Sequence, residues 1–175
     1  MEMSITGWRG SVQEKNVIIE TIKKISKKRD IVCQLLDAGK VYGKEHLIAA
    51  VNHAVRAFLY ETNTCNSLDM EILLYASGKK QINDAIACMG IKEDMKSFVL
   101  VLVGETHLSS YNGKLGMDMY TFLEDLGLKR DDSVIEGSVD VLKQFGISEN
   151  ELKTVDTSMY GDLILEKVAL VDVIK

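Results

Sequence analysis

The sequence contains no proline, so no strong helix breaker divides it. Glycines and clusters of Asn, Asp and Ser must therefore mark the ends of its helices and strands. Cysteine is also scarce, because only Cys33, Cys65 and Cys88 are present and they show no Cys-X-X-Cys spacing. An odd number of cysteines in this arrangement argues against a disulfide framework or a zinc site, and we expect reduced thiols.

Long apolar runs are missing as well. The longest clean run, residues 98–103, is far too short to cross a bilayer. The N-terminal region lacks a basic segment followed by an apolar one, which is the pattern of an export signal. We therefore expect no membrane partner and a cytoplasmic protein.

Signatures of catalysis are absent from the sequence. It has no Gly-X-Gly-X-X-Gly, no Walker loop, no Gly-X-Ser-X-Gly and no His-Glu-X-X-His. His46 and His53 fall on one predicted helix, but a separation of seven residues is too long for two ligands of one ion. We expect neither a metal nor a cofactor, and the sequence argues against an enzyme.

The net charge is −5, and basic residues outnumber acidic ones only in the first 80 residues. An acidic total disfavours indiscriminate nucleic-acid binding but leaves room for a local basic patch. The solvated end of a surface helix is the simpler interpretation of the largest cluster, since helix C-termini favour cations. This cluster consists of Lys23, Lys24, Lys27, Lys28 and Arg29.

The apolar pattern predicts one mixed domain over residues 1–175, because 46% hydrophobic content is enough for a core. Helices and strands mix without strict alternation, so the fold class is α+β (mixed α/β), a small central sheet flanked by several helices. Strands are expected at residues 5–10, 31–36, 97–104 and 133–136, and helices at 17–28, 44–60, 118–127, 139–145 and 160–174. Ser148 and Glu151 have capping-box spacing, with Ile147 and Leu152 as a hydrophobic staple.

Residues 66–90 predict two short helices joined at Gly78. Asn66 and Ser67 are good N-caps, and Gly78 occupies the position where a left-handed residue ends a helix. The second helix is expected to begin within residues 79–81, to bury Ile82, Ala85, Ile86 and Met89, and to end at Gly90.

Lys79 and Lys80 flank the predicted N-terminus of the second helix. Free N–H groups and the helix dipole already favour an anion there, so the two lysines indicate a phosphate site, with Tyr75 one turn back as a stacking surface. The alternative is structural: the lysines are solvated cations and the tyrosine is packed. The residues alone leave both interpretations open.

The same hairpin resembles a known family, the small kinase-binding subunit of the KEOPS complex, which includes the PRPK-binding protein. The resemblance covers most of the chain, and residues 106–130 are less typical of the family. It is carried by Gly43-Lys-Glu-His-Leu47, Asn52-His-Ala54, Arg56-Ala-Phe58, Asn66-Ser67 and Met70-Glu-Ile-Leu-Leu-Tyr-Ala-Ser-Gly-Lys-Lys-Gln-Ile82, with Ile5 to Gly10, Asp132 to Glu136 and Leu165 to Leu170.

The resemblance implies a subunit without catalytic chemistry that docks directly on the small atypical kinase of the complex. It would also hold the single-stranded 3′ tail of tRNA, for threonylcarbamoylation of the adenosine beside the anticodon by the synthase subunit, which it meets through the kinase. Lys80 departs from the Arg of many relatives, and Lys offers only a point charge. The implied tRNA-binding residues are Tyr75, Ser77, Gly78, Lys79, Lys80, Gln81, Ile82 and Met89.

Two other functions stay open at this stage. The first is a protein-protein regulator of the kinase that makes no RNA contact, and the second is an enzyme without a recognised motif. The first would leave Lys79 and Lys80 without a ligand.

Overall fold

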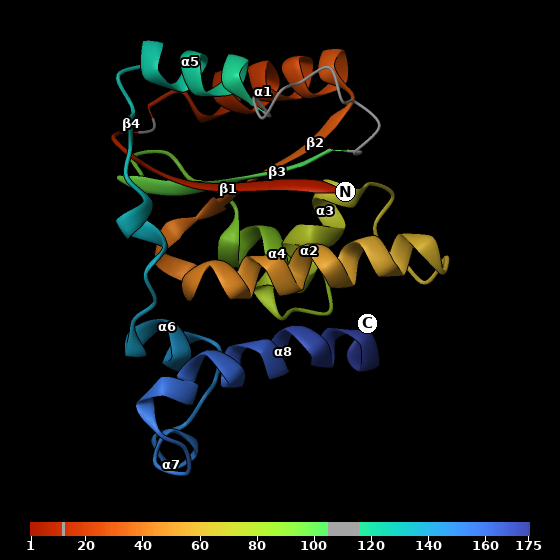
Figure 1. The fold of residues 1–175 in the computed structure, drawn as a ribbon, viewed down its shortest axis with the longest axis vertical. Coiled ribbons are helices and arrows are strands. Elements are labelled where there is room, and N and C mark those ends of the chain that lie inside the picture. The colour runs from red at the N-terminus through yellow and green to blue at the C-terminus, as the bar shows by residue number, and fades with distance from the viewer. Residues whose placement is uncertain (12, 105–115) are drawn as a thin grey trace. The chain divides into compact units, whose positions relative to one another are not determined.

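A computed structural model describes residues 1–11, 13–104 and 116–175 (Figure 1). It combines helices with an antiparallel sheet, which confirms the mixed α+β class. The described residues fall into two compact units, Met1–Ala38 with Ile91–Val134 and Gly39–Gly90 with Ile135–Lys175. The single domain over residues 1–175 stays a prediction. Part of the less typical segment, with His107, lies outside the described residues.

The first unit is built on a four-stranded sheet with the order β2-β3-β1-β4. Its strands are β1 (Glu2–Arg9), β2 (Ile31–Asp37), β3 (Ser97–Gly104) and β4 (Lys129–Arg130), and all pair antiparallel. The continuous apolar run predicted a central strand, and this is confirmed because β3 pairs on both edges and is buried from Phe98 to Val103.

Two helices of the first unit, α1 (Lys15–Arg29) and α5 (Met117–Asp125), lie together on one side of the sheet (Figure 1). The helical spacing of their apolar residues explains this placement, because each helix turns one stripe toward the strands. Leu126, just after α5, fits the same apolar spacing as Leu123 but is 45% exposed. The shared core contains Ile18 and Ile22 of α1, Met119 and Leu123 of α5, and Trp8, Leu100 and Leu102 of the sheet.

The strand predicted at residues 133–136 is wrong. This segment forms the 3-10 turn η3 (Asp132–Ile135), and the edge strand is the shorter β4. Two aspartates explain the difference. Asp131 Oδ1 accepts hydrogen bonds from the N–H and hydroxyl of Ser133, and Asp132 Oδ1 accepts one from Gly7 N–H at 2.8 Å. Such local bonds offer the backbone an alternative to a sheet ladder.

The second unit is helical and is organised around α3. After a half-buried first turn, this helix is buried at every residue from Glu71 to Ser77, because α2, α4 and α8 all pack against it. A helix that is buried all round needs few polar residues, so its two buried polar side chains require partners. The helical elements are α2 (Gly43–Leu59), α3 (Leu68–Ser77), α4 (Ile82–Met89), α6 (Val139–Gln144), α7 (Glu149–Leu152) and α8 (Tyr160–Ile174), with the 3-10 turns η1 (Ala38–Lys40) and η4 (Thr157–Met159).

The approach to α8 agrees closely with the sequence pattern. Ser148 and Glu151 form the predicted capping box, with Ser148 N–H donating to the Glu151 carboxylate at 2.7 Å and Glu151 N–H donating to the Ser148 hydroxyl at 3.2 Å. Ile147 and Leu152 are buried in one small cluster with Leu142 and Ile164. Within the described ranges, no helix has the length and apolarity needed to cross a membrane.

Candidate functional site

The turn between α3 and α4 is fixed by Ser77 and Gly78. The Ser77 hydroxyl donates to Leu74 O at 2.8 Å and accepts from Lys79 N–H at 3.2 Å. Gly78 has the predicted left-handed backbone, with φ 63°. A Cβ at Gly78 would meet only ordinary contacts with Phe145, so the positive φ, and not a lack of space, is what favours glycine.

The two lysines of the turn precede α4 and are not part of it. The helix begins at Ile82, with Gln81 as an N-cap that makes no side-chain capping bond. Its first N–H groups are therefore open to a ligand. Neither Lys79 nor Lys80 forms an ion pair with another described residue, and Lys80 is exposed. Asp84 in the first turn adds one opposing negative charge.

Two of the predicted contact residues have no surface in this structure. Tyr75 and Met89 are both 0% exposed, so neither ring nor thioether presents a free face to a base. The stacking role expected for Tyr75 therefore does not agree with its position. Its environment corresponds to the structural alternative, a packed tyrosine.

An apolar residue that was expected to be buried lies on the surface instead. Ile86 is 44% exposed, one helical turn after the half-buried Ile82. The two side chains share a face of α4 because residues four apart are neighbours on a helix. The spacing alone placed Ile86 inside, since it fits the same stripe as Met89, and only the packing of α4 distinguishes them.

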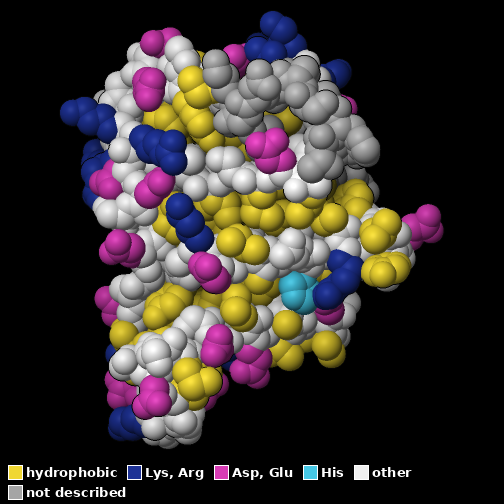
Figure 2. Space-filling model, in the orientation of Figure 1, with side chains coloured by type: hydrophobic (Ala, Val, Ile, Leu, Met, Phe, Trp, Pro, Cys, Tyr) yellow, Lys and Arg dark blue, Asp and Glu magenta, His cyan; other side chains and the backbone are white. Residues whose placement is uncertain are grey.

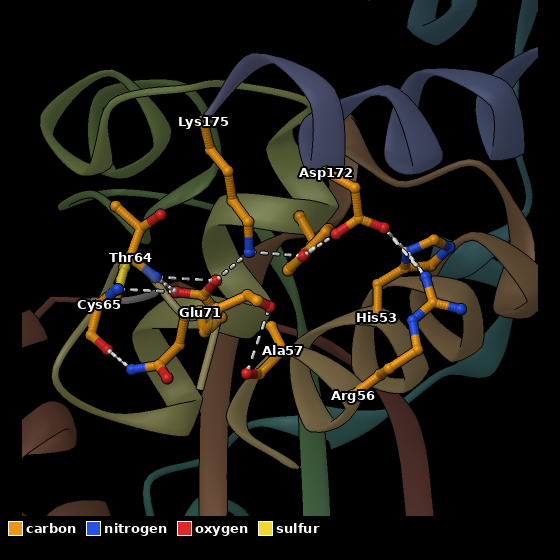
Figure 3. A network of polar contacts seen from close by, with 11 residues as sticks. His53, Arg56, Ala57, Thr64, Cys65, Glu71, Asp172 and Lys175 are labelled. Carbon is orange, nitrogen blue, oxygen red and sulfur yellow. Dashed lines mark hydrogen bonds and ion pairs between the residues drawn. The ribbon is translucent and has the colours of Figure 1, made fainter. Parts of the chain in front are cut away.

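The sequence analysis did not predict a network of polar contacts that joins α3 to neighbouring elements of the second unit (Figure 3). Glu71 is fully buried and accepts hydrogen bonds from the backbone N–H groups of Thr64 and Cys65 and from Lys175 Nζ at 2.9 Å. Burial opposes the charge on Glu71, but these bonds outweigh it and hold its pKa below the usual range. Burial beside the same carboxylate raises the pKa of the Cys65 thiol to about 12, so this cysteine stays protonated.

Tyr75 belongs to the same network. Its hydroxyl donates to Asp172 Oδ1 and accepts from Lys175 Nζ at 2.6 Å, and the ammonium lies 4.5 Å from the ring centroid. Burial, followed by the bond to Asp172, raises the pKa of Tyr75 well above its usual value. Asp172 also faces His53 Nδ1 at 2.8 Å and accepts from Arg56 Nη2 at 2.9 Å. The network thus joins α2, α3 and α8.

Another polar contact secures the last turn of α3. His46, which shares α2 with His53, is 0% exposed. Its Nδ1 accepts from Tyr42 N–H at 3.2 Å, so the Nε2 proton is free to donate to Ala76 O at 2.8 Å. Burial lowers the pKa of His46 to about 4, and the ring is neutral at pH 7. Ala76 O is one of the helix-end carbonyls that need an outside partner.

Exposed apolar side chains lie at the C-terminal ends of both α2 and α8, and we call these side chains together the apolar corner. Hydrophobic side chains are visible at the end of α2 in Figure 2, where Leu59 is 73% exposed and Tyr60 68%. On α8, Val173 is 79% exposed and Ile174 43%. An open pocket adjoins this corner and is lined by Arg56, Ala57, Tyr60, Thr62, Thr64, Asp172 and Lys175.

Of the predicted contact residues, Gly78, Lys79, Lys80, Gln81 and Ile82 reach the surface of the turn, whereas Tyr75, Ser77 and Met89 are buried beneath it. In the part of the chain that the structure describes, no group of three or more His, Cys, Asp or Glu side chains could hold a metal ion. The Tyr75 and Asp172 pair is held in a structural network, where every buried side-chain N or O among the described residues has a partner.

Comparison with known proteins now adds a family to this geometry. The model of the family "Kinase binding protein CGI-121" matches residues 10–172, which is nearly the whole chain. Comparison with curated proteins gives no significant match. The matched range includes the turn and most of the network, and it ends before Val173, Ile174 and Lys175. The chain belongs to the CGI-121 family of kinase-binding proteins.

Proposed function

We propose that this kinase-binding protein is a non-catalytic subunit that also holds the single-stranded 3′ tail of tRNA at residues 77–82. The observation that carries the proposal is the pairing of two lysines without ion-pair partners with an uncapped helix start, on a turn held by Ser77 and Gly78. N–H groups and the positive helix end attract a phosphate, and the lysines add charge. Gln81, as the N-cap residue, lies beside the same N–H groups.

The bases of the tail need an apolar surface beside the phosphates. Ile82 and Ile86 provide one on α4, adjacent to the lysines. Tyr75 and Met89 support the turn from inside and enter the proposal in that role. Lys80 contributes a point charge to the phosphate, whereas Arg would add bidentate contacts. A phosphate contact of this kind does not depend on which base the nucleotide carries.

The test compares intact tRNA with tRNA trimmed of its 3′ tail. Intact tRNA is expected to bind the wild-type protein more tightly, and the difference is expected to be independent of the anticodon. Equal binding of the two RNAs would mean that the turn is not a tail site. The protein would then be a protein-protein regulator of the kinase without RNA contact.

Charge variants make this test specific to the turn. Each phosphate contact to a single strand releases roughly 0.7 counterions, so changing Lys79 and Lys80 to Glu should lower the salt dependence by roughly 1.4 log units per decade of salt. Asp84→Asn is the matched opposite, because it removes the competing negative charge and should strengthen tail binding. If the lysine variant and Asp84→Asn both raise or both lower the affinity for tRNA, the proposed phosphate site at the turn is wrong.

We further propose that the kinase docks on the apolar corner defined by Leu59, Tyr60, Val173 and Ile174. Exposed apolar side chains grouped on one surface are typical of protein-protein interfaces, and aromatic residues are enriched there. This corner is separated in sequence from the turn, so one subunit can contact a kinase and an RNA at different sites. The synthase subunit would be reached through the kinase.

Docking is tested by co-elution of the protein with its cognate kinase at micromolar concentration. Leu59→Glu with Val173→Glu should abolish co-elution and leave tail binding intact. Ile86→Glu is the matched control, since it places the same charge on α4 and should weaken tail binding while the kinase still co-elutes. If Ile86→Glu alone prevents co-elution, the kinase uses the turn and the assignment of the corner is wrong.

In this proposal the bound tRNA is presented in the cytoplasm for threonylcarbamoylation of the adenosine beside the anticodon. The chemistry belongs to the synthase subunit, and this chain supplies binding only. The corresponding measurement is modification of tRNA by the reconstituted complex. The Lys79 and Lys80 variants should raise the tRNA concentration needed for half-maximal rate, without changing the rate at saturation.

A further inference from the structure

The outer face of α1 is a concentrated positive surface on an acidic protein. Lys23, Lys24, Lys27 and Lys28 are all exposed, and none forms an ion pair with another residue in the described ranges. Basic side chains are visible at the top of Figure 2, where α1 lies. Arg29 in the same cluster differs, because it pairs with Asp118. We call the four lysines the α1 basic face.

Helix stability does not account for the α1 basic face. A helix C-terminus favours cations, but the effect falls off within the last turn, which holds Lys27, Lys28 and Arg29. Lys23 and Lys24 lie one turn earlier. Each of them also has a lysine four residues later, and like charges at this spacing destabilise a helix. Glu20 lies four residues before Lys24 and offsets part of this repulsion, but it forms no ion pair within the described ranges. Four exposed lysines on one helix thus leave positive charge available to an anionic ligand.

We propose that the α1 basic face binds the phosphate backbone of double-helical RNA, in the body of the tRNA whose tail occupies the turn. The inference rests on the proposed function for the identity of the RNA. Lys23 and Lys28 are separated by about 7.5 Å along the helix axis. Phosphates of one strand of a DNA duplex recur about every 3.4 Å, and an RNA duplex has a spacing of the same order, so this length faces roughly two or three of them. Such contacts position the RNA without reading its sequence.

Two other anionic partners fit the α1 basic face less well. A helix that binds a membrane surface inserts its apolar face, but Ile18 and Ile22 of α1 are buried in the core of the first unit. The core of a protein interface is depleted in lysine and enriched in aromatic residues, and the α1 basic face contains no aromatic residue. Backbone phosphates, in contrast, are bound mainly by Lys and Arg.

The experiment uses tRNA trimmed of its 3′ tail, which isolates binding to the body. The wild-type protein should bind it weakly and with strong salt dependence. The variant with Lys23, Lys24, Lys27 and Lys28 changed to Gln should lose roughly eight-fold in affinity for each phosphate contact at 0.1 M salt. The control is Lys92→Gln with Lys129→Gln, which removes exposed charge elsewhere in the first unit. Thermal unfolding shows whether both variants remain folded.

A loss of trimmed-tRNA binding in the α1 variant but not in the control supports the proposal. Equal loss in both variants, no loss, or no binding of trimmed tRNA to the wild type overturns it. Binding of phosphatidylserine vesicles that disappears in the α1 variant while tRNA binding is unchanged would assign the face to a membrane and also overturns it. Failure of the proposed function has a different signature, because it requires intact and trimmed tRNA to bind the wild type equally well.

Discussion

The two ends of α3 use charge in opposite ways. Near its start, Glu71 is fully buried and its charge is matched by Lys175 and two backbone N–H groups. Just after its end, the half-buried Lys79 and the exposed Lys80 have no ion pair among the described residues. The charge within α3 thus stabilises the fold, whereas the charges that follow the helix are available to a ligand. Whether a charged residue stabilises the fold or is available to a ligand therefore depends on its burial and its partners, and not on its type.

The largest expected effect is on Glu71. Glu71→Ala would leave Lys175 and the N–H groups of Thr64 and Cys65 without their acceptor in a buried site. Removing one partner of a buried ion pair typically destabilises a protein by about 3–5 kcal/mol, which is the effect expected on the free energy of unfolding. Urea denaturation measures it. A change below about 1 kcal/mol would show that Glu71 is dispensable for stability. The two ends of α3 would then not differ in their contribution to the fold.

A second buried polar residue, His46, stabilises the last turn of α3 through its hydrogen bond to Ala76 O. Its pKa is lowered from 6.5 to about 4 by burial, so the folded state excludes a proton that the unfolded chain accepts. The stabilisation is therefore complete above pH 6.5 and is lost as the pH falls toward 4. A difference of about 2.5 pKa units corresponds to roughly 3 kcal/mol.

His46→Gln provides the control for this pH dependence. Gln can still donate to Ala76 O but does not titrate, so the free energy of unfolding should change less between pH 7 and pH 4. Carboxylates with lowered pKa values lose stability in the same acid range in both proteins, and the difference between the two curves isolates His46. Parallel curves would contradict the buried neutral ring.

Tyr75 is expected to affect the fold and not the salt dependence of RNA binding. Tyr75→Phe keeps the ring but removes the hydroxyl between Asp172 and Lys175, which should destabilise the protein by about 1–3 kcal/mol. Folded protein should retain the wild-type slope of affinity against salt. If Tyr75→Phe leaves stability unchanged but weakens tail binding, the ring or hydroxyl contacts RNA and the buried role is wrong.

The smallest effect on stability is expected at the lysines of the turn. Lys79→Gln with Lys80→Gln removes two charges that have no partner among the described residues, so the free energy of unfolding should change by less than about 0.5 kcal/mol. Binding of the tRNA tail should nevertheless fall. Measuring the free energy of unfolding and tail binding on the same variant shows whether the two lysines serve binding alone. A destabilised variant would mean that they stabilise the fold, as Glu71 does.

The turn itself was predictable from sequence, whereas its surroundings were not. Gly78 followed by two lysines marks a helix end locally, and the capping box at Ser148 and the limits of α8 were likewise given by short-range patterns. The side-chain cap expected at Ser67 is absent, and α4 begins just after the predicted residues. Helix limits commonly shift by one or two residues in this way.

The burial of Tyr75 could not be predicted, because its partners are distant in sequence. Asp172 follows it by 97 residues and Lys175 by 100, and no periodicity connects such positions. The same holds for His46, whose partner Ala76 lies 30 residues later. Amphipathic spacing shows which side of a helix is apolar, but it does not show which polar residues are covered when another helix packs on top.

The distance between Glu71 and Lys175 also has a consequence for biosynthesis. The two are 104 residues apart, so at roughly 5–20 residues per second the ribosome makes the carboxylate several seconds before its ammonium partner. During this interval α2 and α3 can meet, but the Glu71 carboxylate has only the N–H groups of Thr64 and Cys65 as partners. We expect nascent chains stalled before residue 160 to leave this helix pair open to proteolysis, and chains that expose α8 to protect it.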